Sequence, residues 1–192
     1  MGIEFELKFS ADAQKQAAIM AAYPVAYEKF EMETTYFDTA AFDLSDRHIT
    51  LRRRMENGKS VCTVKTPVSG FGRGEWDCES EDINEAIVTL CNNGAPMEIL
   101  LLTAQGISPV CGARFTRYAG IVEHKGAVLE LAIDAGVLMG GGKEIPLCEV
   151  EVELKSGEPE AAVDFGEALA KQFDLTVERK SKFRRAKALA RG

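Results

Sequence analysis

The feature of this sequence that most limits its fold is a period-two alternation of charged and apolar residues. Near the N-terminus, Glu4, Glu6 and Lys8 alternate with four apolar residues. Successive side chains of a β-strand point to opposite faces, so this spacing predicts a strand at 3–9 with one charged and one apolar face. A single strand of this kind is typical of an antiparallel sheet whose charged face meets water.

The same alternation recurs in later segments, which makes a plain solvent-facing sheet a poor explanation. Adjacent like charges on one face, as at Glu149, Glu151 and Glu153, weaken a strand unless cations compensate them. A sheet curled into a barrel, with its charged face inward and helices on its apolar face, would bring carboxylates and cations together. The residues that share a face on other strands are Arg52 with Arg54, Thr63 with Lys65, Arg73 with Glu75, Asp77 and Glu79, and Glu130 with Asp134.

Turn signals divide the chain into hairpins with helices inserted between them. The turn signals are Asn57-Gly58, Ser69-Gly70-Phe71-Gly72, Lys125-Gly126 and Gly140-Gly141-Gly142. The predicted strands are 3–9, 27–37, 47–56, 59–66, 73–81, 113–123, 126–134, 146–155 and 176–177. The predicted helices are 11–22, 82–104 with an interruption at 93–96, 158–173 and 180–191. Hairpins joined by short turns, with helices in blocks, predict an antiparallel α+β architecture.

A charged interior indicates a ligand, because buried charges are costly unless partners complete them. Clusters of carboxylates without suitable His or Cys favour a hard divalent cation such as Mg²⁺ or Mn²⁺. Clusters of Arg and Lys suit phosphate oxygens, which a guanidinium group binds through two parallel hydrogen bonds. Carboxylates, a divalent metal and basic residues in one cavity are the groups that phosphoryl transfer requires.

The overall composition excludes several other classes. The chain has 192 residues and a formal net charge of −7, which predicts a soluble globular protein and argues against nonspecific binding to nucleic acid. Five cysteines without CxxC spacing predict neither a disulfide framework nor a zinc site, and two histidines offer little to a catalytic triad. The charged N-terminus and short apolar runs predict neither a signal peptide nor a membrane span, so we expect a cytoplasmic protein.

Short motifs follow one another in a characteristic order along nearly the whole chain. The first is Glu4-Phe5-Glu6-Leu7-Lys8, an ExExK pattern. The others are Thr35-Tyr36-Phe37-Asp38-Thr39, Leu51-Arg52-Arg53-Arg54, Thr63-Val64-Lys65, Arg73-Gly74-Glu75-Trp76-Asp77, Glu130-Leu131-Ala132-Ile133-Asp134, Cys148-Glu149-Val150-Glu151, and Ser181-Lys182 with Arg185. This ordered set resembles the CYTH superfamily, the triphosphate tunnel metalloenzymes, which include class IV adenylyl cyclases, thiamine triphosphatases and inorganic triphosphatases.

The resemblance implies an α+β fold with an eight-stranded antiparallel β-barrel, a charged interior and flanking helices. It also implies a tunnel that binds a linear triphosphate and one or two divalent metals, Mg²⁺ or Mn²⁺. The implied substrate-binding residues are Lys8, Arg52, Arg54, Lys65, Arg73, Arg117, Lys182 and Arg185. The implied metal ligands are Glu4, Glu6, Asp134, Glu149 and Glu151, with Glu75, Asp77, Glu130 and Glu153 as further candidates. The implied catalytic residues are Glu4, Glu6, Lys8, Arg52, Arg54 and Lys65.

Within the superfamily, the segments 130–136 and 148–157 are most similar to bacterial inorganic triphosphatases. We therefore expect metal-dependent hydrolysis of inorganic triphosphate, with nucleoside triphosphates as a further substrate class. The alternatives are a class IV adenylyl cyclase, a thiamine triphosphatase and, from another class, a non-catalytic polyphosphate-binding module. Relatives often carry an additional helical CHAD domain, whereas we expect a stand-alone CYTH domain at 1–192.

The basic segment 180–191 invites a nucleic-acid interpretation, but no interleaved aromatic platform accompanies its cations. We expect it to form a helix near one mouth of the tunnel. Arg53 has the apolar parity of its strand, so we expect a surface cation there. The expected partner is a small-molecule triphosphate, with no nucleic acid and no membrane, and the expected state is a monomer or homodimer.

Overall fold

One antiparallel sheet organises the part of the chain that the computed structural model describes, residues 2–67 and 73–191, without the side chains of 2–4 and 191. Its strand order is β1-β6-β5-β4-β3-β7-β8-β9-β2-β10. The strands are β1 (Gly2–Glu4), β2 (Glu6–Ser10), β3 (Glu28–Asp38), β4 (Thr50–Glu56), β5 (Lys59–Pro67), β6 (Arg73–Glu79), β7 (Ser108–His124), β8 (Ala127–Gly140), β9 (Lys143–Ser156) and β10 (Thr176–Val177).

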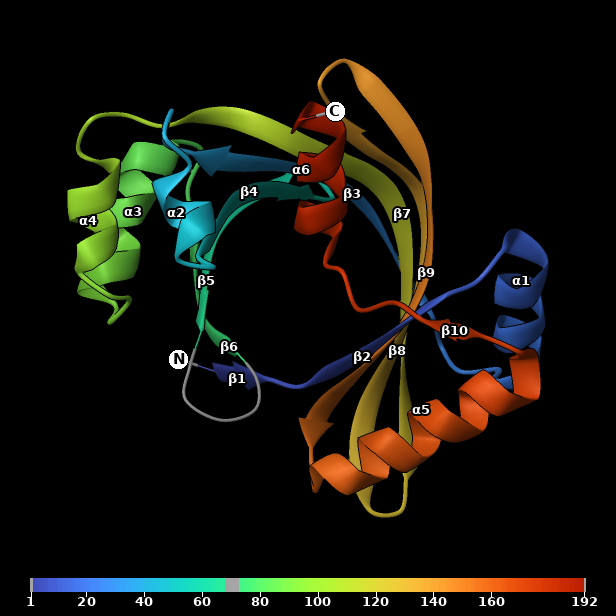
Figure 1. Ribbon diagram of the computed structural model, residues 1–192. Helices are drawn as coiled ribbons and strands as arrows, with labels where there is room; N and C mark the ends of the chain where they lie inside the picture. The colour runs from blue at the N-terminus through green and yellow to red at the C-terminus, as the bar shows by residue number, and fades with distance from the viewer. Residues whose placement is uncertain (1, 68–72, 192) are drawn as a thin grey trace.

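The two edges of the sheet are linked by the chain itself, because β1 and β2 are separated only by Phe5. β1 pairs with β6 near one edge and β2 pairs with β9 near the other, so the sheet is curled into a barrel (Figure 1). With β1 and β2 counted as one strand and the two-residue β10 set aside, eight strands remain of the ten. The predicted eight-stranded antiparallel architecture is confirmed, although no continuous hydrogen-bond ladder joins the edges among the described residues.

Helices cover the outside of the curled sheet in two groups, as Figure 1 shows. One group, α1 and α5, packs over β2 and β9, and the other, α2 to α4, lies over β4 to β6. The helices are α1 (Ala13–Ala22), α2 (Asp43–Asp46), α3 (Ile83–Asn92), α4 (Glu98–Thr103), α5 (Pro159–Phe173) and α6 (Lys182–Arg191). In the described part of the chain, no helix has the length and apolar character needed to cross a membrane.

The apolar faces of the strands form two hydrophobic cores outside the barrel. Leu131, Val150 and Val152 are completely buried in the core that α1 and α5 complete. Val64 and Trp76 belong to the second core, under α2, α3 and α4. The period-two alternation therefore separates an outward apolar face from an inward charged face, as the sequence predicts.

Two-residue turns join the central hairpins where the sequence places them. Asn57 and Gly58 have φ values of 48° and 84°, and the turn at Lys125 and Gly126 has 48° and 80°. Positive φ at both central residues is typical of the type I′ turn, whose twist matches that of the flanking strands. The predicted turn at 69–72 lies outside the described residues.

Helix α6 differs from the other helices because it packs inside one end of the barrel (Figure 1). Ala186 and Leu189 contact Phe115, Leu138 and Leu147, which belong to inward-facing positions of β7, β8 and β9. A Cβ atom at Gly140 would overlap the carbonyl oxygen of Ala186. Glycine at this position therefore lets the helix approach the backbone of β8 closely enough to bring its first turn into the barrel.

The structure departs from the sequence-based element bounds in several places. The strands β7, β8 and β9 are each longer than predicted. The predicted bounds, 113–123, 126–134 and 146–155, leave out the strand ends that surround α6. Helix α2 was not predicted, and strand β4 begins at Thr50 rather than at 47. The buried carboxylate of Asp38 explains α2, because it accepts hydrogen bonds from the backbone N–H groups of Leu44 and Ser45 at 3.0 and 3.1 Å.

Candidate active site

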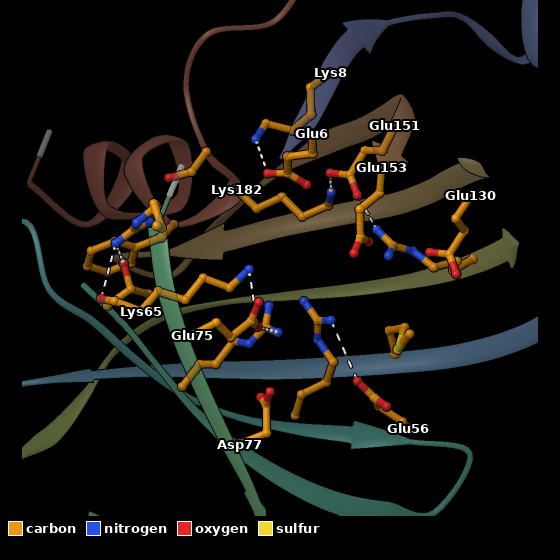
Figure 2. A pocket seen from close by; sticks show the side chains of 18 of the residues that line it. Glu6, Lys8, Glu56, Lys65, Glu75, Asp77, Glu130, Glu151, Glu153 and Lys182 are labelled. Atoms are coloured by element: carbon orange, nitrogen blue, oxygen red, sulfur yellow. Dashed lines mark hydrogen bonds and ion pairs between the residues drawn. The ribbon is translucent and has the colours of Figure 1, made fainter. Parts of the chain in front are cut away.

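The inside of the barrel is a cavity of about 580 Å³ lined mainly by charged side chains (Figure 2). Two of its sides differ in charge, and we name them by their strands. The acidic wall comprises the inward residues of β2, β8 and β9, which are Glu6, Lys8, Glu130, Asp134, Glu149, Glu151 and Glu153. The basic wall comprises the inward residues of β4, β5 and β6, which are Arg52, Arg54, Lys65, Arg73, Glu75 and Asp77.

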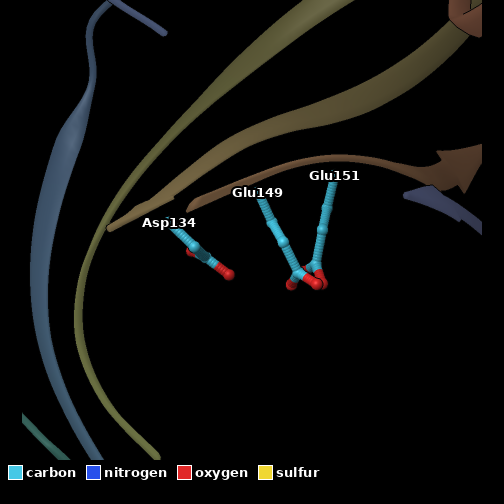
Figure 3. A group of neighbouring side chains, drawn as sticks. All are labelled: Asp134, Glu149 and Glu151. Atoms are coloured by element: carbon cyan, nitrogen blue, oxygen red, sulfur yellow. The ribbon is translucent and has the colours of Figure 1, made fainter. Parts of the chain in front are cut away.

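Strand register assembles the acidic wall. Asp134 lies opposite Glu149 on β9 and opposite Arg117 on β7, and Glu151 lies opposite Lys8 on β2. The carboxylates of Asp134, Glu149 and Glu151 converge, as Figure 3 shows, and each can offer an oxygen within 4.8 Å of the others. We call these three residues the carboxylate triad. All three are buried, and the side chains of Asp134 and Glu149 are 0% exposed.

The ammonium group of Lys182, the first residue of α6, lies among the oxygens of the triad. Its Nζ atom is 2.8 Å from Asp134 Oδ2, 2.5 Å from Glu149 Oε2 and 2.6 Å from Glu151 Oε1. Lys182 also lines the cavity, and Figure 2 shows it beside Glu151. A residue predicted to bind phosphate is thus bound to the predicted metal ligands in this structure.

Two arginines complete the neutralisation of the triad. Arg117 donates two hydrogen bonds of 2.8 Å, from Nε and Nη2, to the two oxygens of Asp134, and it also pairs with Glu151. Arg185, one turn along α6 from Lys182, pairs with Glu149. Three carboxylates therefore face three cations that the chain itself supplies, which satisfies the requirement that buried charges be paired.

The pKa values of Lys182 and Glu151 reflect the pairing, whereas at Glu149 burial outweighs the neighbouring cations and raises the pKa. Burial alone would lower the pKa of Lys182, but Glu151, Asp134 and Glu149 raise it well above its usual value. Burial alone would raise the pKa of Glu151, but Lys182, Arg117 and Lys8 hold it well below its usual value. The opposite charges thus keep both groups ionised in spite of burial.

The cations of the basic wall have weaker partners. Arg52 Nη2 lies 3.7 Å from Glu75 Oε1, and Arg54 Nη1 lies 3.6 Å from Glu56 Oε1. The Nε atom of Arg52 is buried and, among the described residues, has no hydrogen-bond partner. Arg54 Nε donates a hydrogen bond of 2.9 Å to Thr34 Oγ1.

Arg54 is the clearest sign of uncompensated positive charge in the cavity. Burial and the neighbouring charge of Arg52 lower the pKa of Arg54 to about 10. A lowered pKa of a cation means that its surroundings disfavour the charge. A bound anion would relieve this cost, so the basic wall is suited to phosphate oxygens.

The remaining predicted residues take several positions. Lys65 Nζ lies 3.3 Å from Glu75 Oε1, and Arg73 donates a hydrogen bond of 2.8 Å to the backbone carbonyl of His48. Lys8 pairs with Glu6 at 2.5 Å. The residues that line the cavity as predicted are Glu6, Lys8, Arg52, Arg54, Lys65, Arg73, Glu75, Asp77, Arg117, Glu130, Glu151, Glu153 and Lys182.

Four residues with predicted roles or parity lie apart from this lining. Asp134 and Glu149 are buried beneath Lys182, and Arg185 lines a separate surface groove beside α6. Glu79 shares the parity of Glu75 but is exposed at the end of β6. Glu4 ends β1, and its side chain lies outside the described part of the structure. Outside the barrel, Arg53 donates to the backbone carbonyl of Glu81 at 2.8 Å, as its apolar parity indicates.

Several residues in or beside the cavity were missed, although the strand parity could have identified most of them. Glu56 shares the face of Arg54, and Lys155 shares the face of Glu153 and lies 3.5 Å from Glu130. The ring of Phe115 was not predicted to matter. Its centroid is 5.3 Å from Lys182 Nζ, 5.8 Å from Arg54 Cζ and 5.9 Å from Arg117 Cζ, so it contacts cations of both sides by cation–π interactions. No pattern within one strand could reveal this convergence.

The comparison with protein families agrees with this geometry. The profile of the CYTH domain matches residues 2–186. The chain belongs to the CYTH family. A solved structure of the same fold, HpAC1 from Hippeastrum, reported to have a dominant triphosphatase activity, superposes with a TM-score of 0.67 over 100% of this chain and 95% of that one, at 21% identity. The PH1012 protein from Pyrococcus horikoshii superposes with a TM-score of 0.60 over 95% and 98% of the two chains, at 19% identity.

Curated CYTH relatives carry triphosphatase names. An inorganic triphosphatase from Haemophilus influenzae is 27% identical over 190 residues, which are 95% of this chain and 53% of that protein. YjbK from Bacillus subtilis, also named for triphosphatase activity, is 38% identical over 66 residues, or 34% of this chain and 35% of that protein. The chain thus spans about half the length of the Haemophilus enzyme.

Proposed function

We propose that this chain is a metal-dependent triphosphatase that hydrolyses inorganic triphosphate, and nucleoside triphosphates as a further substrate class. The single observation that supports this most is the arrangement of the cavity. A basic wall on which Arg52 and Arg54 make long ion pairs faces Glu151 across one space of about 580 Å³. The other two carboxylates of the triad are buried beneath Lys182. The names of the Haemophilus and Bacillus relatives support the same reaction.

The basic wall would hold the phosphate chain. Arg52 and Arg54 would bind phosphate oxygens through their guanidinium groups, in place of their long contacts with Glu75 and Glu56. Lys65, Arg73 and Lys8 line the same cavity and would bind further oxygens. Binding at several cations would orient the linear substrate along the tunnel and stabilise negative charge that develops on the transferred phosphoryl group.

The acidic wall fits a hard divalent cation, since the described donors at the triad are all carboxylate oxygens. Asp134, Glu149 and Glu151 would hold Mg²⁺ or Mn²⁺, with Glu6 and Glu4 as additional ligands from the first strand. When bound, such an ion neutralises phosphate charge and lowers the pKa of a bound water. Glu75, Asp77, Glu130 and Glu153 would orient the cations of the tunnel or serve a second ion.

A phosphate-release screen tests the proposal. Purified protein would be incubated with tripolyphosphate, ATP or thiamine triphosphate, each with Mg²⁺, with Mn²⁺ and with a chelator. We expect metal-dependent release of orthophosphate from tripolyphosphate. Cyclic AMP and pyrophosphate from ATP would instead identify an adenylyl cyclase, a preference for thiamine triphosphate would identify that hydrolase, and binding without turnover at any metal concentration would identify a polyphosphate-binding module.

The setting of the activity is also part of the proposal. The five described cysteines are unpaired, which supports a reducing, cytoplasmic compartment. The substrate would be a free small molecule rather than nucleic acid or a membrane component, and the chain would act as a monomer or homodimer. Size-exclusion chromatography with light scattering tests the last point, and assembly beyond a dimer would contradict it.

A further inference from the structure

The position of Lys182 bears on how a metal ion and a substrate would bind in this cavity. The triad and its three cations, Lys182, Arg117 and Arg185, form a neutral group in this structure. A divalent cation that joined this group without any other change would leave an excess of two positive charges in a buried place, which is costly. Departure of one of the three cations from the triad would offset part of this excess.

Of the three cations, Lys182 is the one whose departure would free the triad. Its ammonium contacts all three carboxylates, whereas Arg185 pairs with only one of the three. Arg117 is held by two hydrogen bonds to Asp134 and extends from the middle of a long strand. Lys182 begins α6, directly after an irregular segment, and the four-carbon stem of a lysine can rotate its ammonium to a new position.

The cavity offers Lys182 a second set of partners. Its side chain lines the same cavity as Arg52, Arg54 and Lys65, where the phosphate chain would bind. The ring of Phe115, 5.3 Å from Lys182 Nζ and 5.8 Å from Arg54 Cζ, lies between the triad and the basic wall. A phosphate oxygen in this space would attract the ammonium away from the carboxylates.

We infer that Lys182 is an internal competitor for the metal and that it moves from the carboxylate triad to the substrate when the site is loaded. This inference rests on the proposed function, because it assigns the triad to a metal and the cavity to a triphosphate. Metal and substrate each favour the same movement of Lys182, so the binding of one strengthens the binding of the other. Without substrate, the triad holds its own lysine and binds divalent ions weakly.

Metal affinity without substrate tests the competition. Mn²⁺ binding would be measured by electron paramagnetic resonance for the wild type, Lys182→Met and the matched control Lys125→Met. Lys125 also pairs with a carboxylate, that of Asp164 at 2.7 Å, but neither residue lines the cavity. We expect Lys182→Met to bind Mn²⁺ on the order of tenfold more tightly and Lys125→Met to match the wild type. Unchanged or weaker Mn²⁺ binding in a folded Lys182→Met protein would overturn the inference.

A second measurement uses the wild type and does not depend on how the variant folds. Reductive methylation followed by mass spectrometry reports the accessibility of each lysine amine. We expect Lys182 to resist methylation in the metal-free protein and to react faster when saturating Mg²⁺ is present, while the rate at Lys125, which pairs with Asp164 away from the cavity, stays constant. Continued protection of Lys182 at saturating Mg²⁺ would overturn the inference.

Neither measurement depends on turnover, so the two ideas can fail separately. A protein that exchanges Lys182 for a metal but releases no phosphate from any triphosphate would contradict the proposed function alone. An active triphosphatase in which Lys182 stays protected would contradict the competition alone.

Discussion

The acidic and basic walls enclose the same cavity but handle their charges in opposite ways. The triad of the acidic wall is neutralised at close range, with Lys182 within 2.5 to 2.8 Å of all three carboxylates. On the basic wall, Arg52 and Arg54 lie 3.6 Å or more from the carboxylates they face. The acidic wall is thus the more closely paired side, because the ion pairs of the two arginines are long. Within the described part of the chain, however, Glu149 Oε2 and Arg185 Nε on the acidic side lack hydrogen-bond partners.

Because of this difference, we expect the acidic wall to affect mainly the stability of the fold and the basic wall to affect mainly activity. Removing one partner from the close ion pairs on the acidic wall should destabilise the fold, because it leaves a buried charge unpaired. On the basic wall, the long ion pairs of Arg52 and Arg54 leave capacity for an anion, and the lowered pKa of Arg54 indicates that its buried charge is costly. Substitutions on the acidic wall should therefore change stability first, and those on the basic wall should change activity first.

The largest expected effect is on stability, from removing the cation at the triad. Lys182→Met leaves three buried carboxylates short of a partner, and it should lower the free energy of unfolding of the metal-free protein by about 3 to 5 kcal/mol. Lys155→Met should cost about 1 kcal/mol or less, because the side chain of Lys155 is 39% exposed. Urea unfolding of both variants, with and without Mg²⁺, measures this. If both variants lost the same free energy of unfolding, the triad would be no more important for stability than the other charges of the acidic wall.

The next effect is on activity, from the basic wall. Arg54→Met should lower kcat/KM for tripolyphosphate by about a hundredfold or more, as the loss of one charge-stabilising donor typically does. Its melting temperature should equal or exceed that of the wild type, because a costly buried charge is removed. Steady-state kinetics and thermal unfolding measure the two quantities.

The neighbouring residue supplies the control. Arg53→Met removes an identical charge from the outer face of the same strand, where Arg53 bonds to the carbonyl of Glu81. Its kcat/KM should stay within about twofold of the wild type, since surface substitutions change free energies by less than about 0.5 kcal/mol. Similar losses of activity at both positions would contradict the assignment of the two faces.

A smaller effect is the acid dependence of stability. The pKa of Glu151 is lowered from 4.5 in the folded state, so its charge stabilises the fold above pH 4.5. This stabilisation is lost as the pH falls through the folded pKa, at about 1.4 kcal/mol for each pH unit between the two values. Glu151→Gln should flatten the decline in the free energy of unfolding between about pH 4.5 and 2.5. If the free energy of unfolding declined with the same slope against pH in the wild type and in Glu151→Gln, Glu151 would not be the cause of the acid dependence.

The smallest effect concerns how Arg54 is positioned. Thr34→Val removes the hydroxyl that accepts the hydrogen bond of Arg54 Nε, with little change in shape. Loss of one such bond is worth about 1 kcal/mol, so KM should rise about fivefold while kcat changes little. A KM equal to that of the wild type would mean that other contacts fix Arg54.

The sequence predicts the walls well because strand parity is a local property. Arg52 and Arg54 face inward, and Arg53 faces outward, for the same reason that Val150 and Val152 lie in the outer core. The motifs then predict the family, which the profile over 2–186 confirms. The roles assigned to the individual site residues remain predictions.

Contacts between distant elements could not be read from the sequence. The placement of Lys182 within the triad depends on α6 packing inside the barrel, which requires the close approach at Gly140. The convergence of three cations on Phe115 joins β4, β7 and α6. Helix α2 depends on hydrogen bonds to Asp38, which lies outside the helix, so the four residues of α2 do not by themselves predict it.

The position of a bound oxyanion tests the central claim, that the weakly paired arginines of the basic wall bind the substrate, most directly. A crystal structure of the metal-free protein soaked with tripolyphosphate would locate the phosphates. We expect phosphate oxygens at the guanidinium groups of Arg52 and Arg54. Phosphate bound at the groove beside Arg185, with the basic wall unchanged, would contradict it.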